Sequence, residues 1–206
     1  MDKLELTIGR LERDRKEGGE TLIQIALQYP VISGEGEVLN ACLARTAENL
    51  VTALAQEMQG EARAAAKQMP ETLPYQINGT FTTTCNTPGV LSFYTDVFLY
   101  AGGMRGITHR YGSSFLTAGG GRTLFLTSLF PAGSDVRTLV SDFISKRHGI
   151  NASALRDAFS PENFYLTDSG LEVFFPPGSV SPVAGGIAAF AMPYGESGLR
   201  SPPDMV

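Results

Sequence analysis

Hydrophobic and polar residues alternate along several segments of the chain. Leu4, Leu6 and Ile8 share one parity, and every second residue from Ile23 to Val31 is again hydrophobic, with the turn sequence EGGE between the two runs. This period of two predicts an antiparallel hairpin closed by a glycine turn. The same alternation from Tyr75 to Cys85 predicts a half-buried strand.

A helical spacing of hydrophobic residues replaces this alternation twice. It predicts a first main helix over Glu37–Met58, with two further turns before Pro70, and a second main helix over Asp135–Arg147. Ser134 is predicted to cap the start of the second helix, and Gly149 is predicted to cap its end.

The remaining segments are predicted as strands. Val90–Tyr100 is hydrophobic on both faces and predicts a central strand, whereas residues 107–117 and 122–130 flank the turn AGGG and predict a second hairpin. Three more strands are predicted within Pro161–Tyr194, after a short helix over Ser153–Ala158. Because the strands arrive as hairpins, we predict an α+β fold with antiparallel sheets built from hairpins and two main helices packed on one side.

Composition narrows the possible partners and location. A chain of 206 residues suits one domain or two closely packed halves, and its net charge of -5 argues against a nucleic-acid partner. No hydrophobic run is long enough to predict a membrane span. The N-terminal sequence lacks the hydrophobic core of a signal peptide, so we expect a cytoplasmic protein if Met1 is the native start and an extracytoplasmic one if the chain is a trimmed piece.

Few side chains offer catalytic chemistry. Asp96 and His109 lie on neighbouring predicted strands, and Ser113 or Ser114 is close in sequence, which together are the materials of nucleophilic catalysis. The alternative is a histidine hydrogen-bonded within a sheet, because no GxSxG motif accompanies these residues. We therefore predict no catalytic residue, and keep a hydrolase that uses Asp96 and His109 as the alternative.

Cysteine and histidine spacing gives no metal site. Cys42 and Cys85 fall on hydrophobic faces, which predicts small buried side chains, with a disulfide between them as the alternative. His148 lies at a predicted helix end, where capping explains it. We predict no metal and no cofactor.

A glycine-rich turn and a set of aromatic residues are the candidate binding features. Gly102, Gly103 and Gly106 form either an anion-binding nest closed by Arg105 or a tight turn that needs positive φ. Six aromatic residues either floor a sugar- or peptide-binding groove or fill the core: Tyr94, Phe98, Tyr100, Phe174, Phe175 and Tyr194. The predicted binding residues are Tyr100, Gly102, Gly103, Met104, Arg105, Gly106 and His109.

Five segments carry a family pattern that spans roughly Leu22 to Tyr194. They are YPVISGEGEVLNACL, VLSFYTDVFLYAGGMRG, GGGRTLFLTSLFPAGSD, FSPENFYLTDSGLEVFF and GGIAAFAMPY. Together they resemble the extracytoplasmic region of the anti-sigma factor RsiV and its relatives, which are marked by a tyrosine–proline before the first helix and an asparagine early in it, here Asn40. The family's glycine turn carries a histidine where this chain has Arg105, so no role of that histidine is carried over.

The resemblance implies binding rather than catalysis. It implies an N-terminal ββ-α-ββ portion over residues 1–100 and a C-terminal β-hairpin-α-βββ portion over residues 101–195, and residues 196–206 are predicted as a flexible tail without a core to join. In RsiV this region binds lysozyme, and a related module accompanies a peptidoglycan deacetylase without being the enzyme. We therefore predict a non-catalytic binding or sensor module whose partner is a lysozyme-like protein or a peptidoglycan fragment, with an intracellular protein-interaction domain as a third possibility.

Overall fold

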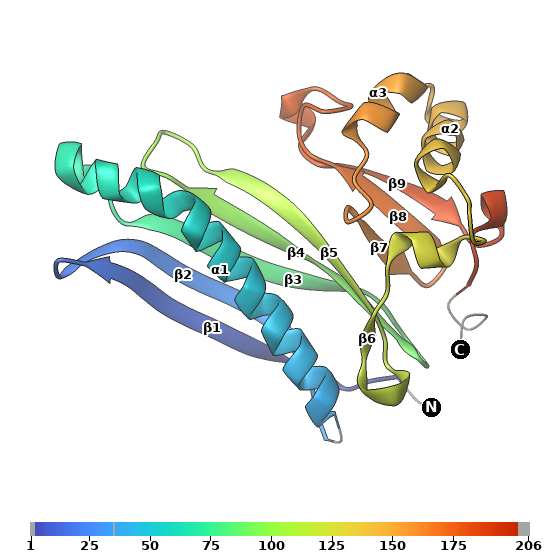
Figure 1. The fold of residues 1–206 in the computed structure, drawn as a ribbon, viewed down its shortest axis with the longest axis horizontal. Coiled ribbons are helices and arrows are strands. Elements are labelled where there is room, and N and C mark those ends of the chain that lie inside the picture. The colour runs from blue at the N-terminus through green and yellow to red at the C-terminus, as the bar shows by residue number, and fades with distance from the viewer. Residues whose placement is uncertain (1–2, 35, 202–206) are drawn as a thin grey trace. The chain divides into compact units, whose positions relative to one another are not determined.

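The computed structural model describes residues 3–34 and 36–201 and confirms the α+β class (Figure 1). Its described helices are α1 (Glu37–Gln68), α2 (Val136–His148) and α3 (Ala152–Ala158). Its strands are β1 (Leu6–Glu17), β2 (Glu20–Ile32), β3 (Tyr75–Thr87), β4 (Val90–Tyr100), β5 (Ile107–Leu116), β6 (Arg122–Thr123), β7 (Phe164–Thr167), β8 (Gly170–Phe175) and β9 (Ala188–Pro193).

The strands form two sheets, and the chain folds into two compact units. One sheet has the order β1-β2-β3-β4-β5-β6 and the other the order β7-β8-β9. Residues 5–81 and 95–109 make up the first unit, here called the helix-on-sheet unit. Described residues 3–4, 82–94 and 110–201 make up the second, here called the C-terminal unit.

The helix-on-sheet unit begins with the predicted hairpin. β1 and β2 pair antiparallel around Gly18 and Gly19, whose φ angles of 60° and 91° explain why glycines occupy the turn. The pairing of β2 with β3, however, is parallel, with Ile25 opposite Ile77. The predicted fold class holds, but this pair departs from the predicted antiparallel pairing, because α1 provides the long crossover that a parallel pair requires.

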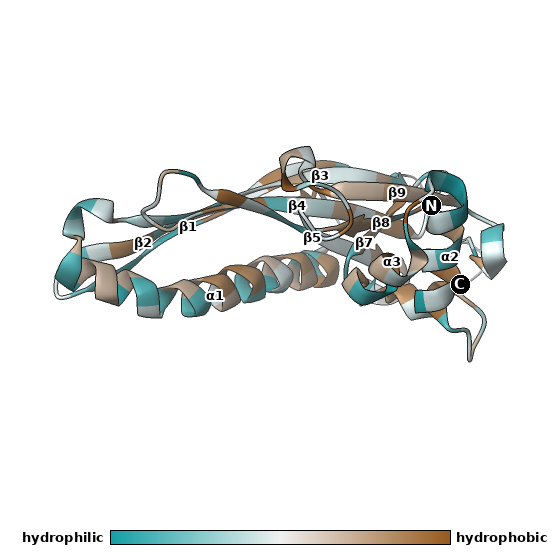
Figure 2. Cartoon of the chain, turned by 90° about the horizontal axis from the view of Figure 1, so that it is seen from above, coloured by the Kyte–Doolittle hydropathy of each residue, from teal (hydrophilic) through white to brown (hydrophobic). Residues whose placement is uncertain are grey.

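Helix α1 covers one face of this unit's strands (Figure 2). Its buried stripe includes Leu43 and Val51, while Ile25 and Ile77 are buried on the strands. Asn40 fastens the start of the helix to the end of β2, since its side-chain amide donates to the Ile32 carbonyl at 2.9 Å and its oxygen accepts from the Ile32 N–H at 2.7 Å. This pair of hydrogen bonds to the backbone of one residue explains the asparagine early in the helix.

The C-terminal unit packs helices against the smaller sheet. β7 and β8, and then β8 and β9, pair antiparallel, as the sequence predicts. α2 contacts α3 and β9, and the His148 ring lies 5.0 Å from the Phe190 ring at this contact. Gly149 ends α2 with φ at 71°, which confirms the predicted cap.

Three local predictions are corrected in this unit. Only Arg122–Thr123 of the predicted strand 122–130 pairs as a strand, because the chain then turns into a 3-10 helix that buries Leu126 and Leu129. The α2 cap is Asp135 rather than Ser134, since the Asp135 carboxylate accepts the Thr138 N–H at 3.1 Å. The start of the predicted flexible tail does join the core, because Leu199 is 2% exposed; residues 202–206 lie outside the described residues.

No helix in the described ranges combines the length and the hydrophobicity that crossing a membrane requires.

Candidate functional site

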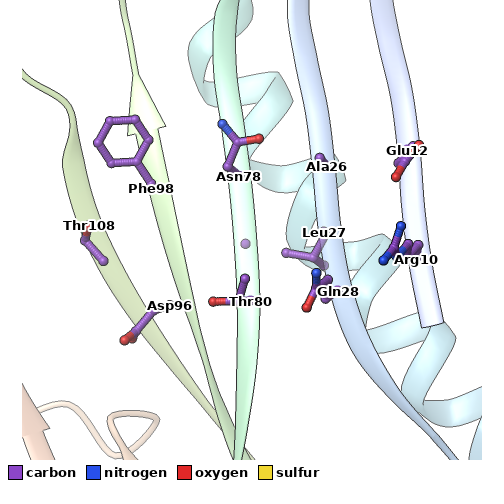
Figure 3. A pocket seen from close by; sticks show the side chains of 11 residues that line it. Arg10, Glu12, Ala26, Leu27, Gln28, Asn78, Thr80, Asp96, Phe98 and Thr108 are labelled. Atoms are coloured by element: carbon purple, nitrogen blue, oxygen red, sulfur yellow. The ribbon is translucent and has the colours of Figure 1, made fainter. Parts of the chain in front are cut away.

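A groove of about 540 Å³ lies on the sheet of the helix-on-sheet unit (Figure 3). We call it the sheet groove. In Figure 3 its side chains lie in front of the strands and α1 lies behind them. Strands β1 to β5 contribute the lining: Arg10, Glu12, Ala26, Leu27, Gln28, Asn78, Gly79, Thr80, Asp96, Phe98 and Thr108.

Strand alternation separates the groove from the core. On β3, Tyr75 and Ile77 are buried, whereas Asn78 and Thr80 are exposed and line the groove. The same parity holds on β4, where Val97 is buried between two lining residues. One sequence pattern therefore builds a hydrophobic face for α1 and a polar face for the groove.

The groove floor depends on a close approach of β2 and β3. Leu27 pairs with Gly79 in the parallel register, and a Cβ at residue 79 would lie 2.1 Å from the Leu27 Cδ1 atom. A side chain at residue 79 would therefore displace Leu27 from the core. Glycine therefore keeps β2 and β3 packed on the core face beneath Asn78 and Thr80.

The lining offers both hydrogen-bond donors and acceptors. Gln28 and Asn78 carry amides, Thr80 and Thr108 carry hydroxyls, and Asn78 donates to the side-chain oxygen of Gln76 at 3.2 Å. The charged side chains that line the groove are Arg10, Glu12 and Asp96. None of the eleven described lining residues is a histidine, cysteine, serine or lysine.

Asp96 and His109 do not share a face. Asp96 and Thr108 both line the sheet groove. Since successive side chains of a strand point to opposite faces, His109, next to Thr108 on β5, points away from the groove. The proposed Asp–His contact of a hydrolase is therefore not formed, because the two residues have opposite parity relative to the groove.

Ser114, one of the two candidate nucleophiles, lies in the protein interior. Ser114 is buried, and its hydroxyl lies 2.8 Å from the Ser92 hydroxyl. The Ser92 oxygen in turn accepts the Leu166 N–H at 2.9 Å. Ser114 is therefore enclosed in the interior of the C-terminal unit and presents no open nucleophile.

The predicted binding turn joins β4 to β5 within the helix-on-sheet unit. Gly102 has φ at 75°, and a Cβ there would lie 2.6 Å from the Thr72 Cβ atom, so the turn lies against the 3-10 helix that follows α1. A Cβ at Gly106 would lie 2.1 Å from the Phe98 ring. Of the three glycines only Gly102 has positive φ, which is the geometry of a tight turn. Met104 at its tip is fully exposed.

Four of the six aromatic candidates belong to the C-terminal unit. Phe174 and Phe175 are buried in it, and the Tyr194 hydroxyl donates to the Thr167 carbonyl at 3.2 Å. The Arg110 guanidinium lies 3.7 Å from the centre of the Tyr94 ring, a cation–π contact. Among the six aromatic candidates, Phe98 is the one that lines the sheet groove, with 39% of its surface exposed.

A second hollow, of about 680 Å³, lies beside the last turns of α2 in the C-terminal unit. Its lining carries charges of both signs, contributed by Asp142, Lys146, Arg147 and Glu196. Cys42 and Cys85 are both free thiols, so the disulfide alternative is not formed. No group of three or more metal-binding side chains occurs within residues 3–34 and 36–201.

Sequence reasoning did not identify most of the groove residues. The exposed parity of β3, with Asn78 and Thr80, was visible as a polar face, but the order of five strands is needed to bring Arg10 and Thr108 onto it. Without the order and the register of the strands, the sequence does not show which polar faces lie side by side.

Comparison with known proteins identifies two matched segments. Residues 17–108 match the family model described as deacetylase PdaC, and residues 127–195 match the model described as a protein of unknown function, DUF3298. No curated protein matches the chain.

Two solved structures of DUF3298 family proteins are similar over nearly their whole length. One, from Bacteroides fragilis, has 16% identity and a TM-score of 0.62, with 100% of this chain and 98% of that chain covered. The other, from Pseudomonas aeruginosa PAO1, has 14% identity and a TM-score of 0.63, with 96% and 95% covered. At such identities the likeness establishes the fold.

Proposed function

We propose that this chain is a non-catalytic binding or sensor module of the RsiV type, whose ligand is a protein or a cell-wall component. The observation that carries the proposal is the sheet groove, an open surface whose lining combines apolar and hydrogen-bonding groups without a histidine, cysteine, serine or lysine. The succession of a PdaC-like and a DUF3298-like segment is consistent with this resemblance.

The two carboxylates of the groove are placed for binding rather than for paired acid–base chemistry. Glu12 lies on β1 and Asp96 on β4, with β2 and β3 between them. Three strand spacings separate their backbones by about 14 Å. The paired carboxylates of glycoside hydrolases lie only about 5–9.5 Å apart. Each carboxylate of the groove is therefore suited to accept hydrogen bonds from a ligand independently.

The β4–β5 turn provides a second contact surface in this proposal. Tyr100, Met104 and Arg105 belong to the predicted binding residues, and Met104 and Arg105 are exposed in the turn. An unbranched, polarisable methionine adapts to the surface of a partner. A protein ligand would contact this turn, whereas a smaller ligand would occupy the groove.

Calorimetric titration of the full chain with lysozymes and with soluble peptidoglycan fragments tests the proposal. We expect heat of binding with one of these ligands and no change in the ligand after incubation, as followed by chromatography and by release of acetate. The name of the PdaC family makes acetate release the sharpest enzymatic readout. Any turnover of the ligand would replace this proposal with an enzymatic function. Loss of that turnover in Asp96→Asn or His109→Gln would assign it to these residues, and its persistence would assign it elsewhere.

A further inference from the structure

The balance of charge in the sheet groove indicates the class of its ligand. One arginine and two carboxylates are spread over its rim, while the centre is formed by Gln28, Asn78, Thr80 and Gly79. A phosphate or polyanion needs a concentration of positive charge that this lining lacks. The central side chains are neutral and carry both donors and acceptors, which suits a ligand that is itself neutral and rich in hydroxyl groups.

The spacing of these groups fits one sugar ring. Gln28 on β2 and Asn78 on β3 come from adjacent strands. Asn78 pairs with Ala26, so Gln28 is its diagonal neighbour, about 8 Å away. Amide groups at that separation can contact hydroxyls on opposite edges of a single pyranose. Thr80 lies two residues from Asn78 on the same face, so the pattern continues along β3.

Phe98 adds an apolar surface beside the polar ones. Phe98 is 39% exposed and lines the groove, and Gly106 leaves room for its ring at the turn. The C–H face of a sugar ring packs on such a surface while its hydroxyls bond to neighbouring polar groups. The volume of about 540 Å³ lies within the range of small-molecule sites.

We propose that the sheet groove binds an uncharged oligosaccharide. Gln28, Asn78 and Thr80 bond its hydroxyl groups, Phe98 packs against a ring face, and Arg10, Glu12 and Asp96 contact its outer hydroxyls. This inference rests on the proposed binding function and specifies the ligand class of one of its two surfaces.

Calorimetric and chemical-shift titrations of the full chain test this assignment. The probes are the uncharged tetramers of glucose and of N-acetylglucosamine, with the anionic tetramer of galacturonic acid as the charge control. We expect one uncharged tetramer to bind and the anionic tetramer to bind at least tenfold more weakly. Shifts of the Gln28 and Asn78 side-chain amides would locate the ligand.

A matched pair of variants distinguishes the groove from the rest of the sheet. Gln28→Ala removes a lining amide and is expected to weaken binding by about 3- to 10-fold, the loss of one net hydrogen bond. Gln24→Ala removes the same group from an exposed position of the same strand that does not line the groove, and should leave binding unchanged. Asn78→Ala is the second groove variant, and circular dichroism checks the fold of each.

Each outcome decides the assignment. No binding of either uncharged tetramer overturns it, as does equal weakening by Gln28→Ala and Gln24→Ala, or preference for the anionic tetramer. Binding of a lysozyme without any uncharged tetramer would overturn the oligosaccharide while leaving the proposed binding function in place. Conversion of a tetramer would overturn the proposed function itself.

Discussion

Replacing Ser92 by alanine is expected to remove three hydrogen bonds from the interior of the C-terminal unit. The Ser92 hydroxyl accepts the Leu166 N–H at 2.9 Å, bonds the Ser114 hydroxyl at 2.8 Å and donates to the Ser113 carbonyl at 3.3 Å. A serine hydroxyl has one donor and two acceptor positions, so this residue, which is fully buried, uses all three.

The magnitude depends on which partner is left without a hydrogen bond. In Ser92→Ala the buried Leu166 N–H loses its acceptor, which costs about 1–3 kcal/mol, and about 1 kcal/mol of net bonding is lost as well. In Ser114→Ala the Leu166 N–H keeps its acceptor, so only about 1 kcal/mol is lost. We therefore expect Ser92→Ala to lower the free energy of unfolding by roughly 2–4 kcal/mol, clearly more than its neighbour.

Urea denaturation followed by circular dichroism and tyrosine fluorescence measures this difference. Both variants should shift the midpoint while the slope stays that of the native chain, which indicates a change of stability alone. Equal destabilisation by the two substitutions would refute the assignment of Ser92 as the acceptor for Leu166. A loss below about 0.5 kcal/mol for Ser92→Ala, the range of ordinary surface changes, would refute the whole network.

Three further predictions follow from local geometry. Gly112→Ala should lower the free energy of unfolding by about 1–3 kcal/mol or more, because a Cβ there would lie 1.7 Å from the Phe164 carbonyl oxygen; an unchanged urea midpoint would contradict this. Gly60→Ala should raise it by about 0.5–1 kcal/mol, since this glycine lies inside α1 facing open space, and a lowered melting temperature would argue against it. Burial, and then the hydrogen bond to Glu172, raises the pKa of Tyr165 above its ordinary value of 10.0, so its contribution to stability is complete below that pH and declines as the pH rises beyond it. Absorbance at 295 nm should show one late-ionising tyrosine fewer in Tyr165→Phe, and an unchanged titration curve would contradict the assignment.

The sequence predicted the positions of the helices and strands better than it predicted which strands pair and in which direction. Alternation located β2 and β3 because one face of each strand carries the buried residues, and that contrast is present in each segment alone. The parallel pairing of β2 with β3 was missed because hairpin-like spacing says nothing about a crossover helix. Residues 122–130 were mistaken for a strand because Leu124, Leu126 and Leu129 are buried with a short-range spacing that a 3-10 turn shares with an extended chain.

The candidate binding residues were predictable from the sequence only where they lie in one continuous segment. The turn Tyr100–Gly106 is one continuous segment, and Gly102 does occupy a position with positive φ, as a turn interpretation requires. The sheet groove instead combines one to three residues from each of five strands, and Arg10 meets Gln28 only through the hairpin register. The Asp96–His109 pair failed for the same reason, because sequence distance does not reveal which face of a sheet each side chain takes.

The layered arrangement of the helix-on-sheet unit allows binding and folding to be tested separately. Its hydrophobic core lies between α1 and one face of the strands, where Ile25, Ile77 and Val97 are buried. The groove lies on the opposite parity, where Asn78 and Thr80 are exposed and contribute little to that core. Substitutions of such exposed side chains usually change stability by less than about 0.5 kcal/mol. Gly79 is the exception, because it is shared by both layers: a side chain there would press on Leu27 and alter the groove floor together with the core. A loss of ligand binding in a groove variant that unfolds normally therefore reports on recognition, whereas the same loss at residue 79 does not distinguish recognition from packing.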